Sequence, residues 1–365
     1  MTQSNSTPVE NRQEIAFLYD VLRNNPNGDP RSGANRPRLD PETNHCYVTD
    51  VRLKRYIRDQ LEDDGFGILI RNAQNEDGEV YTREQLLQDR LDEVDLDDVA
   101  EENLRDEIFG NFLDNSADVR YFGATLGVDT DDDRINNALP DQFTGPVQFS
   151  PGRSLHPVTI NEEYNSLTSV IATKEGKQSG GYDLDDHRIN YGLIGFHGLV
   201  DENGADTTNL TQEDVERLDT LLWRSLKNQT ITRSKVGQEP RFYLRVEYET
   251  NGFHIGGLTE ALSLDEDRSK QAEEIRNVTD VTVDLTDLKK KLEANKNRVA
   301  NIYLVVDQAL TMSYHDTEDD ETYTSDEYPV VNDFLKDMFS TVVDPATSLT
   351  IVDPYKKAQQ MASND

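Results

Sequence analysis

Hydrophobic residues along the chain recur with two periods, and these predict where strands and helices form. Residues 14–23 are apolar through most of their length, which predicts a largely buried strand. Residues 49–61 place apolar side chains on one face at every fourth position, which predicts a helix with Thr49 as its N-cap. Residues 67–71 form a short apolar run, and we expect a further strand there.

The second half of the chain shows the same two periods. Residues 191–200 read as an apolar strand interrupted by glycines, and residues 241–248 alternate as a strand does. Residues 211–227 predict a helix, with Thr211 and Asp214 placed as a capping box. Further strands are expected at 281–285 and 302–306, and a last helix at 331–339.

The segments between these elements differ in composition. Residues 74–118 are densely acidic, with helical patterns at 83–91 and 99–109, and indicate an inserted, solvated lobe. We expect a strand at 119–126, hairpins within 145–171 and an acidic linker at 317–325.

Without these insertions, the elements follow the order β-α-β-β-α-β. This order predicts an α+β protein with a ferredoxin-like, RRM-like palm, although the aromatic motif of RNA-recognition domains is absent. The expected divisions are the first half of the palm (14–73), the acidic helical insertion (74–118), a central insertion with a β-hairpin thumb (119–186), the second half of the palm (187–250) and a C-terminal elaboration (251–357).

Charge narrows the class of protein. The 365 residues include 71 acidic and 37 basic side chains, giving a net charge of −34. Such a surface suits molar salt, where the Debye length is about 3 Å, so we expect a halophilic source. The single cysteine, Cys46, allows no disulfide within the chain and is expected to be an inert buried thiol. Neither a membrane span nor a signal peptide is indicated, so we expect a cytoplasmic protein.

Two stretches depart from the acidic background and are locally cationic. The first contains Arg23, Arg31, Arg36, Arg38, Arg52, Lys54, Arg55 and Arg58, and the second contains Arg224, Lys227, Arg233, Lys235, Arg241 and Arg245. Arginine binds phosphate through two parallel hydrogen bonds, so these stretches predict a polyanion-binding surface. The alternative is a pair of structural clusters held by salt bridges.

Residues 24–30, Asn-Asn-Pro-Asn-Gly-Asp-Pro, lie inside the first cationic stretch. Their composition predicts a stiff polar loop that displays backbone N–H groups and amide side chains. The six histidines lack metal-ligand spacing, and no glycine-rich phosphate loop occurs, so we expect neither a metal site nor a cofactor.

Several short motifs resemble, in the same order, the repeated backbone subunit of type I-B CRISPR Cascade complexes, a family of the RAMP superfamily. They are Asn25-Pro26-Asn27-Gly28-Asp29-Pro30, then Thr49-Asp50-Val51-Arg52-Leu53-Lys54-Arg55, Asp118-Val119-Arg120-Tyr121-Phe122-Gly123, Gly145-Pro146-Val147-Gln148, Tyr191-Gly192-Leu193 and Arg233-Ser234-Lys235.

The resemblance implies a non-catalytic scaffold that polymerises along CRISPR RNA (crRNA). Its implied partners are crRNA, target DNA through the guide, further copies of itself, and the cap, large and repeat-processing Cascade subunits. A thumb within residues 149–181 is implied to kink the guide. Carried over by position, the implied RNA contacts are Arg23, Asn24, Asn27, Lys54, Arg55, Arg58, Arg120, Gln148, Arg153, Ser154, His187, Arg188, Tyr191, Arg233 and Lys235. Asp29 is expected to hydrogen-bond within its own loop.

Two other functions stay open from the sequence. Related backbone subunits cut RNA, and a metal-dependent endoribonuclease would need clustered carboxylates, for which Asp20 and Asp29 are available. An acidic assembly protein that binds no nucleic acid is the third hypothesis, and the two cationic stretches argue against it.

Overall fold

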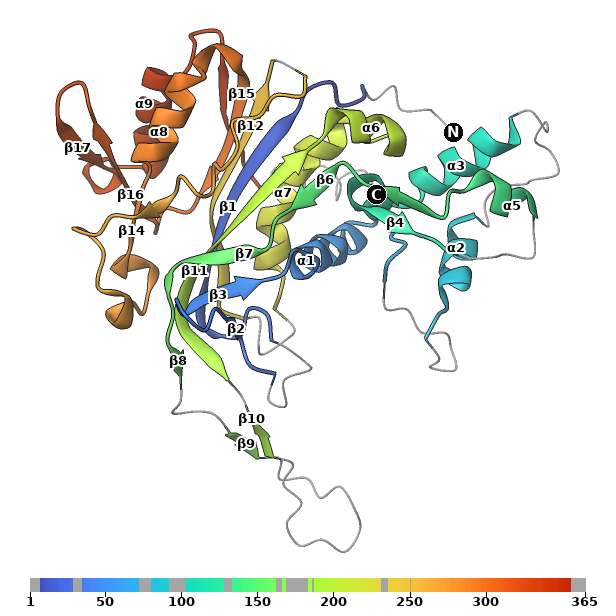
Figure 1. Cartoon of the computed structure of the whole chain (residues 1–365), viewed down its shortest axis with the longest axis horizontal. Helices are drawn as coiled ribbons and strands as arrows, with labels where there is room; N and C mark the ends of the chain where they lie inside the picture. Colours follow the sequence, from blue (N-terminus) through green and yellow to red (C-terminus); the bar gives the residue numbers. More distant parts are fainter. Residues whose placement is uncertain are drawn as a thin grey trace, which may run out of the picture.

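A long, mainly antiparallel sheet runs through the middle of the molecule, and the other elements pack around it (Figure 1). The computed structural model describes residues 7–28, 35–71, 80–91, 103–127, 133–161, 166–168, 183–185, 187–230, 236–249 and 251–355. The strand order is β18-β15-β12-β1-β11-β7-β3-β2, and only the β15–β18 pair is parallel. The strands are β1 (Gln13–Asn24), β2 (Arg38–Leu39), β3 (His45–Val48), β7 (Gly152–Pro157), β11 (Arg188–Val200), β12 (Gln238–Tyr248), β15 (Val299–Val306) and β18 (Ser348–Ile351).

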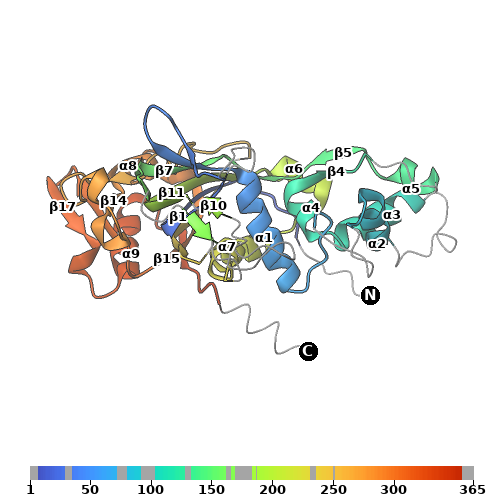
Figure 2. The same ribbon diagram turned by 90° about the horizontal axis from the view of Figure 1, so that it is seen from below.

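Strand β1 is buried on both faces because it lies at the centre of this sheet. Phe17 and Tyr19 point into one hydrophobic core, and Ala16 and Leu18 point into another. The first core is closed by helices α1 (Asp50–Asp63) and α7 (Gln212–Lys227), which lie on the same side of the sheet (Figure 2).

The C-terminal part of the chain closes the second core. It contributes a four-stranded sheet in the order β13-β14-β16-β17 and two helices that pack beside it. These elements are β13 (Ser263–Leu264), β14 (Thr282–Asp284), β16 (Thr311–Asp316), β17 (Glu321–Thr324), α8 (Thr286–Ala294) and α9 (Val331–Val342), with short 3₁₀ turns at Ala272–Glu274, Val278–Asp280, Lys296–Arg298 and Ser325–Glu327. Their core is shared mainly with β1, β11, β12 and β15, and Leu155 of β7 packs against it.

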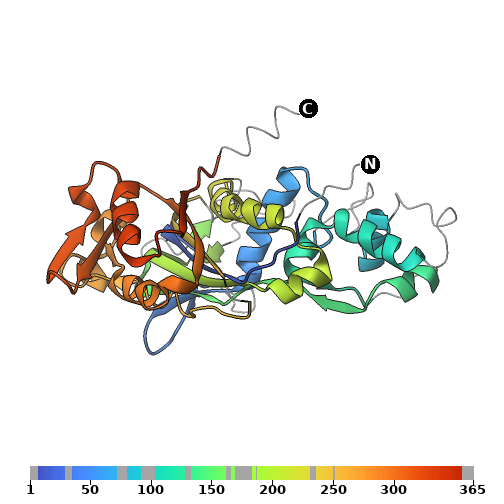
Figure 3. The same cartoon turned by 90° about the horizontal axis from the view of Figure 1, so that it is seen from above.

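An acidic lobe extends from the opposite end of the molecule (Figure 3). It has a small hydrophobic core of its own, centred on Ile108, Phe112 and Phe143. Its elements are α2 (Arg83–Leu91), α3 (Leu104–Asp114), α4 (Ala117–Phe122), β4 (Gly123–Thr125), α5 (Asp133–Ala138) and β5 (Gln142–Thr144), and α6 (Glu202–Thr208) lies next to α4.

The segment between this lobe and β11 follows the edge of the sheet. Strands β6 (Val147–Phe149), β7 and β8 (Ile160–Asn161) each pair with β11, one after another along its length. Strands β9 (Ser166–Thr168) and β10 (Asp183–Asp185) form a separate antiparallel pair that projects from the sheet (Figure 1).

Most long elements confirm the sequence patterns, and the α+β class is confirmed. Thr49 caps α1, Thr211 and Asp214 form a capping box on α7, and the apolar face of β12 packs into the second core. Helix α2 has the expected bounds, whereas α3 ends five residues beyond its expected end (114 − 109).

Four expectations are wrong. Residues 67–71 lie outside any strand, and of residues 119–126 the first half belongs to helix α4 and only Gly123–Thr125 form a strand, β4. The expected linker at 317–325 contains β17, which pairs with β16. The strands found within 145–161 pair with β11 instead of forming hairpins with one another. None of the helices described is long and apolar enough to cross a membrane.

Candidate nucleic-acid interface

The asparagine loop after β1 is built inward, toward the protein. The Asn27 side chain is buried, and its Oδ1 accepts hydrogen bonds from the backbone N (2.8 Å) and the Oγ1 (2.9 Å) of Thr49. Since the Thr49 Oγ1 in turn accepts from the backbone N of Arg52 (3.3 Å), Asn27 fixes the start of helix α1. The RNA contact expected of Asn27 stays a prediction, whereas its positioning of α1 is visible.

Asn24 connects the same loop to the second cationic stretch. Its side chain is buried, its Nδ2 donates to the carbonyl of Val236, and its Oδ1 accepts from the backbone N of Asn25 (2.9 Å). Arg23 beside it has a left-handed backbone (φ 47°) and an exposed side chain. The Arg23 carbonyl accepts a hydrogen bond from Arg188 (3.1 Å), which brings these two expected site residues together.

The three cations expected to face phosphates from α1 have different surroundings. Lys54 Nζ lies 3.3 Å from Asp50 and donates to Gln148 Oε1 (2.8 Å), so two expected site residues contact each other. Arg55 pairs with Asp59 at 2.8 Å and is the most exposed of the three. Arg58 is largely buried, and its Nε donates to Asp118 (2.9 Å).

Asp118 forms a joint between α1 and the acidic lobe. Its fully buried carboxylate accepts from Arg58 and from the backbone N of Leu69 (2.8 Å) and Ile70 (3.1 Å). The Arg58 guanidinium also lies 5.2 Å from the centre of the Phe122 ring. The motif at 118–123 therefore has a visible structural role.

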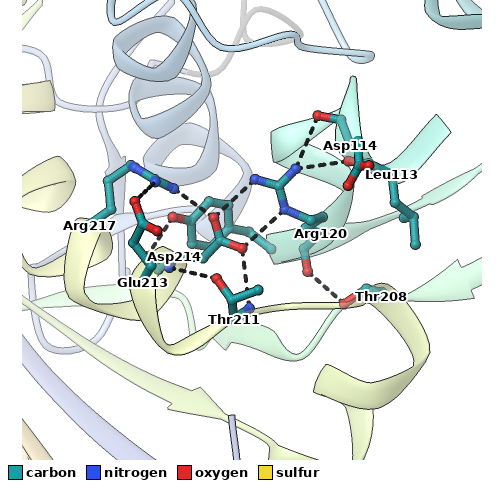
Figure 4. A network of polar contacts seen from close by, with 9 residues as sticks. Leu113, Asp114, Arg120, Thr208, Thr211, Glu213, Asp214 and Arg217 are labelled. Atoms are coloured by element: carbon teal, nitrogen blue, oxygen red, sulfur yellow. Dashed lines mark hydrogen bonds and ion pairs between the residues drawn. The ribbon is translucent and has the colours of Figure 1, made fainter. Parts of the chain in front are cut away.

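Arg120, from the same motif, belongs to a second joint (Figure 4). Its guanidinium binds both carboxylate oxygens of Asp214 (3.1 and 3.0 Å) and the carbonyl of Leu113 (2.9 Å). Arg217 adds a further ion pair to Asp214 (2.6 Å). Burial acts to raise the pKa of Asp214, but the hydrogen bonds and charge of Arg120, followed by the charge of Arg217, outweigh it and hold that pKa below its usual value.

The described members of the second cationic stretch all have carboxylate partners. Arg224 binds Asp64 through two bonds of 2.7 Å, the buried Arg245 binds Asp219 at 2.6 Å, and Lys227 pairs with Glu239. The alternative of a salt-bridged structural cluster therefore fits these residues. Arg233 and Lys235 lie outside the described residues.

The carboxylate that the nuclease hypothesis would use is also engaged. Asp20 is 2% exposed, and its Oδ2 accepts from the Tyr191 hydroxyl (3.2 Å) and lies 2.9 Å from Arg241. Burial raises the pKa of Asp20 to about 6 despite the opposing charge of Arg241. Tyr191, an expected RNA contact, is thus buried with Asp20, and Asp29 lies outside the described residues. Among the residues that the structure describes, no three His, Cys, Asp or Glu side chains are grouped to hold a metal ion.

The remaining expected residues lie along β7 and at the start of β11. Ser154 is buried, where it accepts from the backbone N of Cys46 (2.9 Å) and donates to the carbonyl of His156 (2.7 Å). His187 is buried too, and its Nε2 has no hydrogen-bond partner among the described residues. Arg153 is exposed and has no carboxylate partner within the described part of the chain.

Arg153 lies at a pocket that sequence reasoning missed. The pocket has a volume of about 400 Å³ and is formed by β3, β7, β11 and the loop before β13. His45, Tyr47 and His197 line it together with Arg153. Burial, followed by the charge of Arg153, lowers the pKa of His45. The residues that line the pocket come from segments about 100 and 50 positions apart, so no single motif brings them together. The only signal in the sequence was the alternation along each strand.

Comparisons with known proteins identify the class. The family model described as "CRISPR-associated protein Cas7" matches residues 11–286. A relative from Haloferax volcanii, named "CRISPR-associated protein Cas7", is 51% identical over 327 residues, which cover 87% of this chain and 92% of the relative.

The chain therefore belongs to the CRISPR-associated Cas7 family. The resemblance to the backbone subunits of CRISPR complexes is confirmed, and the halophilic relative fits the acidic composition.

Two solved structures were also found. One chain, from a "CRISPR RNA-guided surveillance complex, pre-nicking", has a TM-score of 0.47 and 10% identity, covering 97% of this chain and all of that one. Another, from a "CRISPR RNA-guided surveillance complex", has a TM-score of 0.43 and 13% identity, covering 89% of this chain and 99% of that one.

Proposed function

We propose that this chain is the non-catalytic backbone subunit of a type I CRISPR interference complex. The guide RNA would bind on the surface formed by β3, β7 and the C-terminal end of β1. One observation supports this location above the others. In a chain of net charge −34, Lys54, Arg55 and Arg58 of α1 and the described cations of the second stretch have carboxylate partners, whereas Arg23 and Arg153 stay exposed without such a partner in the described part of the chain. An exposed guanidinium that no carboxylate neutralises is available to phosphate.

The palm of this subunit is β12-β1-β11-β7 with helices α1 and α7. The four strands are antiparallel neighbours in the order expected of a ferredoxin-like fold, and the two helices pack on one face, which supports an RRM-like palm. The divisions at 14–73, 74–118, 119–186, 187–250 and 251–357 are part of this proposal, with the difference that the palm strand β7 (Gly152–Pro157) falls within 119–186, which the sequence assigned to the central insertion. So is a thumb within 149–181, of which residues 162–165 and 169–181 lie outside the described residues; the projecting pair of β9 with β10, which begins just beyond 181, supports it.

Within the interface, Arg23, Arg153 and Arg188 are the proposed phosphate ligands. Lys54, Arg55 and Gln148 supply a second set of polar contacts beside α1. Six other expected residues support this surface from inside the protein, because their polar groups already make internal hydrogen bonds. They are Asn24, Asn27, Arg58, Arg120, Ser154 and Tyr191. His187, Arg233 and Lys235 remain proposed contacts by position alone.

Several copies would bind side by side along one guide, together with cap, large and repeat-processing subunits. The protein then reads the RNA backbone, and base pairing between guide and target DNA supplies the sequence specificity. This division of labour requires no reaction from the backbone subunit.

The test is to purify the complex from its host at molar salt and to sequence the nucleic acid it carries. We expect a high 260/280 absorbance ratio and intact small RNA of one dominant size with repeat-derived ends. A complex that contains all its subunits and no RNA would overturn the proposal. A double variant, Arg23→Gln with Arg153→Gln, should lose guide while it keeps its helical circular dichroism. Lys336→Gln, a surface change on α9, is the matched control.

A further inference from the structure

The pocket beside Arg153 differs in charge from the other large hollows on the described part of the molecule. A hollow of about 480 Å³ near the start of β1 is lined by Glu10, Glu213, Glu216 and Glu247. Another, of about 810 Å³ beside β14, is lined by four acidic residues and Arg268. The pocket beside Arg153 instead joins one arginine and two histidines to a single carboxylate, Glu260. A small anionic group is therefore better matched to it than to either acidic hollow.

Two of its histidines have buried ring nitrogens. The Nδ1 atoms of His45 and His197 are buried without a hydrogen-bond partner among the described residues. His197 Nδ1 lies 3.5 Å from Glu14, a separation at the outer limit of a hydrogen bond. Glu14 is itself fixed, because it accepts from the Tyr248 hydroxyl (2.7 Å) and from the backbone N of Gly256 (3.0 Å).

Apolar surfaces complete the lining. Leu155 and Leu262 line the pocket with Pro151, and the Tyr47 ring stands beside them on β3. Tyr47 is oriented by a hydrogen bond of 3.4 Å from its hydroxyl to Asp40. An aromatic ring and aliphatic side chains next to an arginine suit a ligand with one flat apolar part and one charged part.

We propose that this pocket binds a single nucleotide unit, with its phosphate on Arg153 and its base against Tyr47 and Leu155. The inference rests on the proposed function, because the nucleotide would belong to the bound guide. The volume of about 400 Å³ falls within the range of about 300–1,000 Å³ typical of small-ligand sites. His45 and His197 would lie at the phosphate end, and Glu260 would face the sugar hydroxyls, for which a carboxylate is a suitable acceptor.

The test uses the full chain, freed of RNA, in molar KCl. Titration calorimetry with adenosine monophosphate and cytidine monophosphate should show one site. Adenosine alone and inorganic phosphate alone should each bind at least tenfold more weakly, because each fills only one part of the pocket. Arg153→Gln should weaken monophosphate binding at least tenfold, and Tyr47→Leu should do so while Tyr47→Phe does not. Lys336→Gln on α9 should leave it unchanged.

The outcomes separate this inference from the proposed function. If neither monophosphate binds, or if Arg153→Gln and Tyr47→Leu bind as the unchanged chain does, the pocket is no nucleotide site, even where the purified complex carries guide RNA. If the monophosphates bind as expected but the complex carries no RNA, the pocket stands and the guide-binding function falls. Inorganic phosphate binding as tightly as a monophosphate would overturn the role of Tyr47 and Leu155.

Discussion

Replacing Arg58 by Met tests whether this cation stabilises the fold or binds RNA. The sequence places Arg58 with Lys54 and Arg55 on one helix, yet its Nε donates to the fully buried Asp118. Methionine keeps much of the apolar stem that packs near Phe122 and removes the charge. The change leaves Asp118 with two backbone donors and no counter-charge.

The expected loss follows from burial. Breaking a buried ion pair by removing one partner costs about 3–5 kcal/mol, since the remaining charge stays buried and uncompensated. Arg58 has a side-chain exposure of 11% and Asp118 of 0%, so solvent screens the pair little. The loss is large against the stability of about 5–15 kcal/mol typical of native domains.

Urea unfolding in molar KCl measures this loss. The only tryptophan, Trp223, is a residue of α7 and is 5% exposed where that helix packs on the first core, so its fluorescence reports the transition. Arg55→Met is the matched control, because Arg55 is an exposed cation on the same helix, paired with Asp59. We expect the control to shift stability by less than about 1 kcal/mol.

A double-mutant cycle isolates the pair. In an Asp118→Asn background, Arg58→Met should lower the free energy of unfolding by at least about 2 kcal/mol less than it does in the unchanged chain, because the carboxylate that pairs with Arg58 is absent. Arg58→Met could instead unfold at the same urea concentration as the unchanged chain and lose guide RNA. The Arg58–Asp118 ion pair would then contribute little to stability, and Arg58 would face phosphate as the sequence suggested.

Three further changes test other parts of the structure. Asn27→Ala removes both bonds to Thr49 and should lower the free energy of unfolding by about 1–3 kcal/mol, whereas Asn27→Asp keeps the acceptor and should lower it less; equal losses in urea unfolding would argue against the cap. The pKa of Asp214 in the folded chain lies below its unfolded value of about 3.9, so the stabilisation from this carboxylate is complete above pH 3.9 and is lost as the pH falls through the folded pKa. Between pH 5 and 3, the free energy of unfolding should therefore change less steeply with pH in Arg120→Met than in the unchanged chain. An unchanged slope would exclude the Arg120–Asp214 ion pair as its source. Burial raises the pKa of Cys46 to about 12, so a thiol reagent at pH 8 should modify the folded chain only at the rate of unfolding, and fast labelling would show an accessible thiol.

Local rules predicted the elements whose causes lie within one segment. The N-cap at Thr49 and the capping box of Thr211 and Asp214 depend on residues three positions apart, and both are present. The alternation of β12 also holds, because one of its faces enters a single core. These features could be read from the sequence, since the contacts that Asn27 and Arg120 make with the caps from distant positions leave the caps in place.

The wrong expectations have distant causes. Residues 67–71 look like a strand, but the backbone N–H groups of Leu69 and Ile70 are bound by Asp118, almost fifty positions away. The acidic run at 317–325 looks like a linker, yet Asp320 adopts a left-handed backbone (φ 60°) and Tyr323 stacks on Tyr314, their ring centres 5.2 Å apart. The apolar composition of 67–71 hides the first arrangement, and the acidic composition of 317–325 hides the second.

The same reasoning explains why only part of the candidate interface could be predicted from the sequence. Arginines such as Arg120 and Arg245 were visible as cations, but their partners Asp214 and Asp219 lie 94 and 26 residues away. The folded structure is needed to distinguish these arginines from Arg153, which lines a pocket with two histidines and a single carboxylate, Glu260.

At high salt, the difference between the carboxylate-paired arginines and Arg153 becomes important for RNA binding. At molar salt the Debye length is about 3 Å, so an exposed cation such as Arg55 attracts a phosphate only at contact. Counterion release also favours binding less, because the observed affinity falls steeply as salt rises. A guanidinium set in a pocket with Tyr47 and Leu155 keeps its directed hydrogen bonds and its apolar contacts under these conditions. In a halophilic chain, an RNA contact that survives in the cell should therefore be built as a pocket, and a diffuse cationic surface should contribute less.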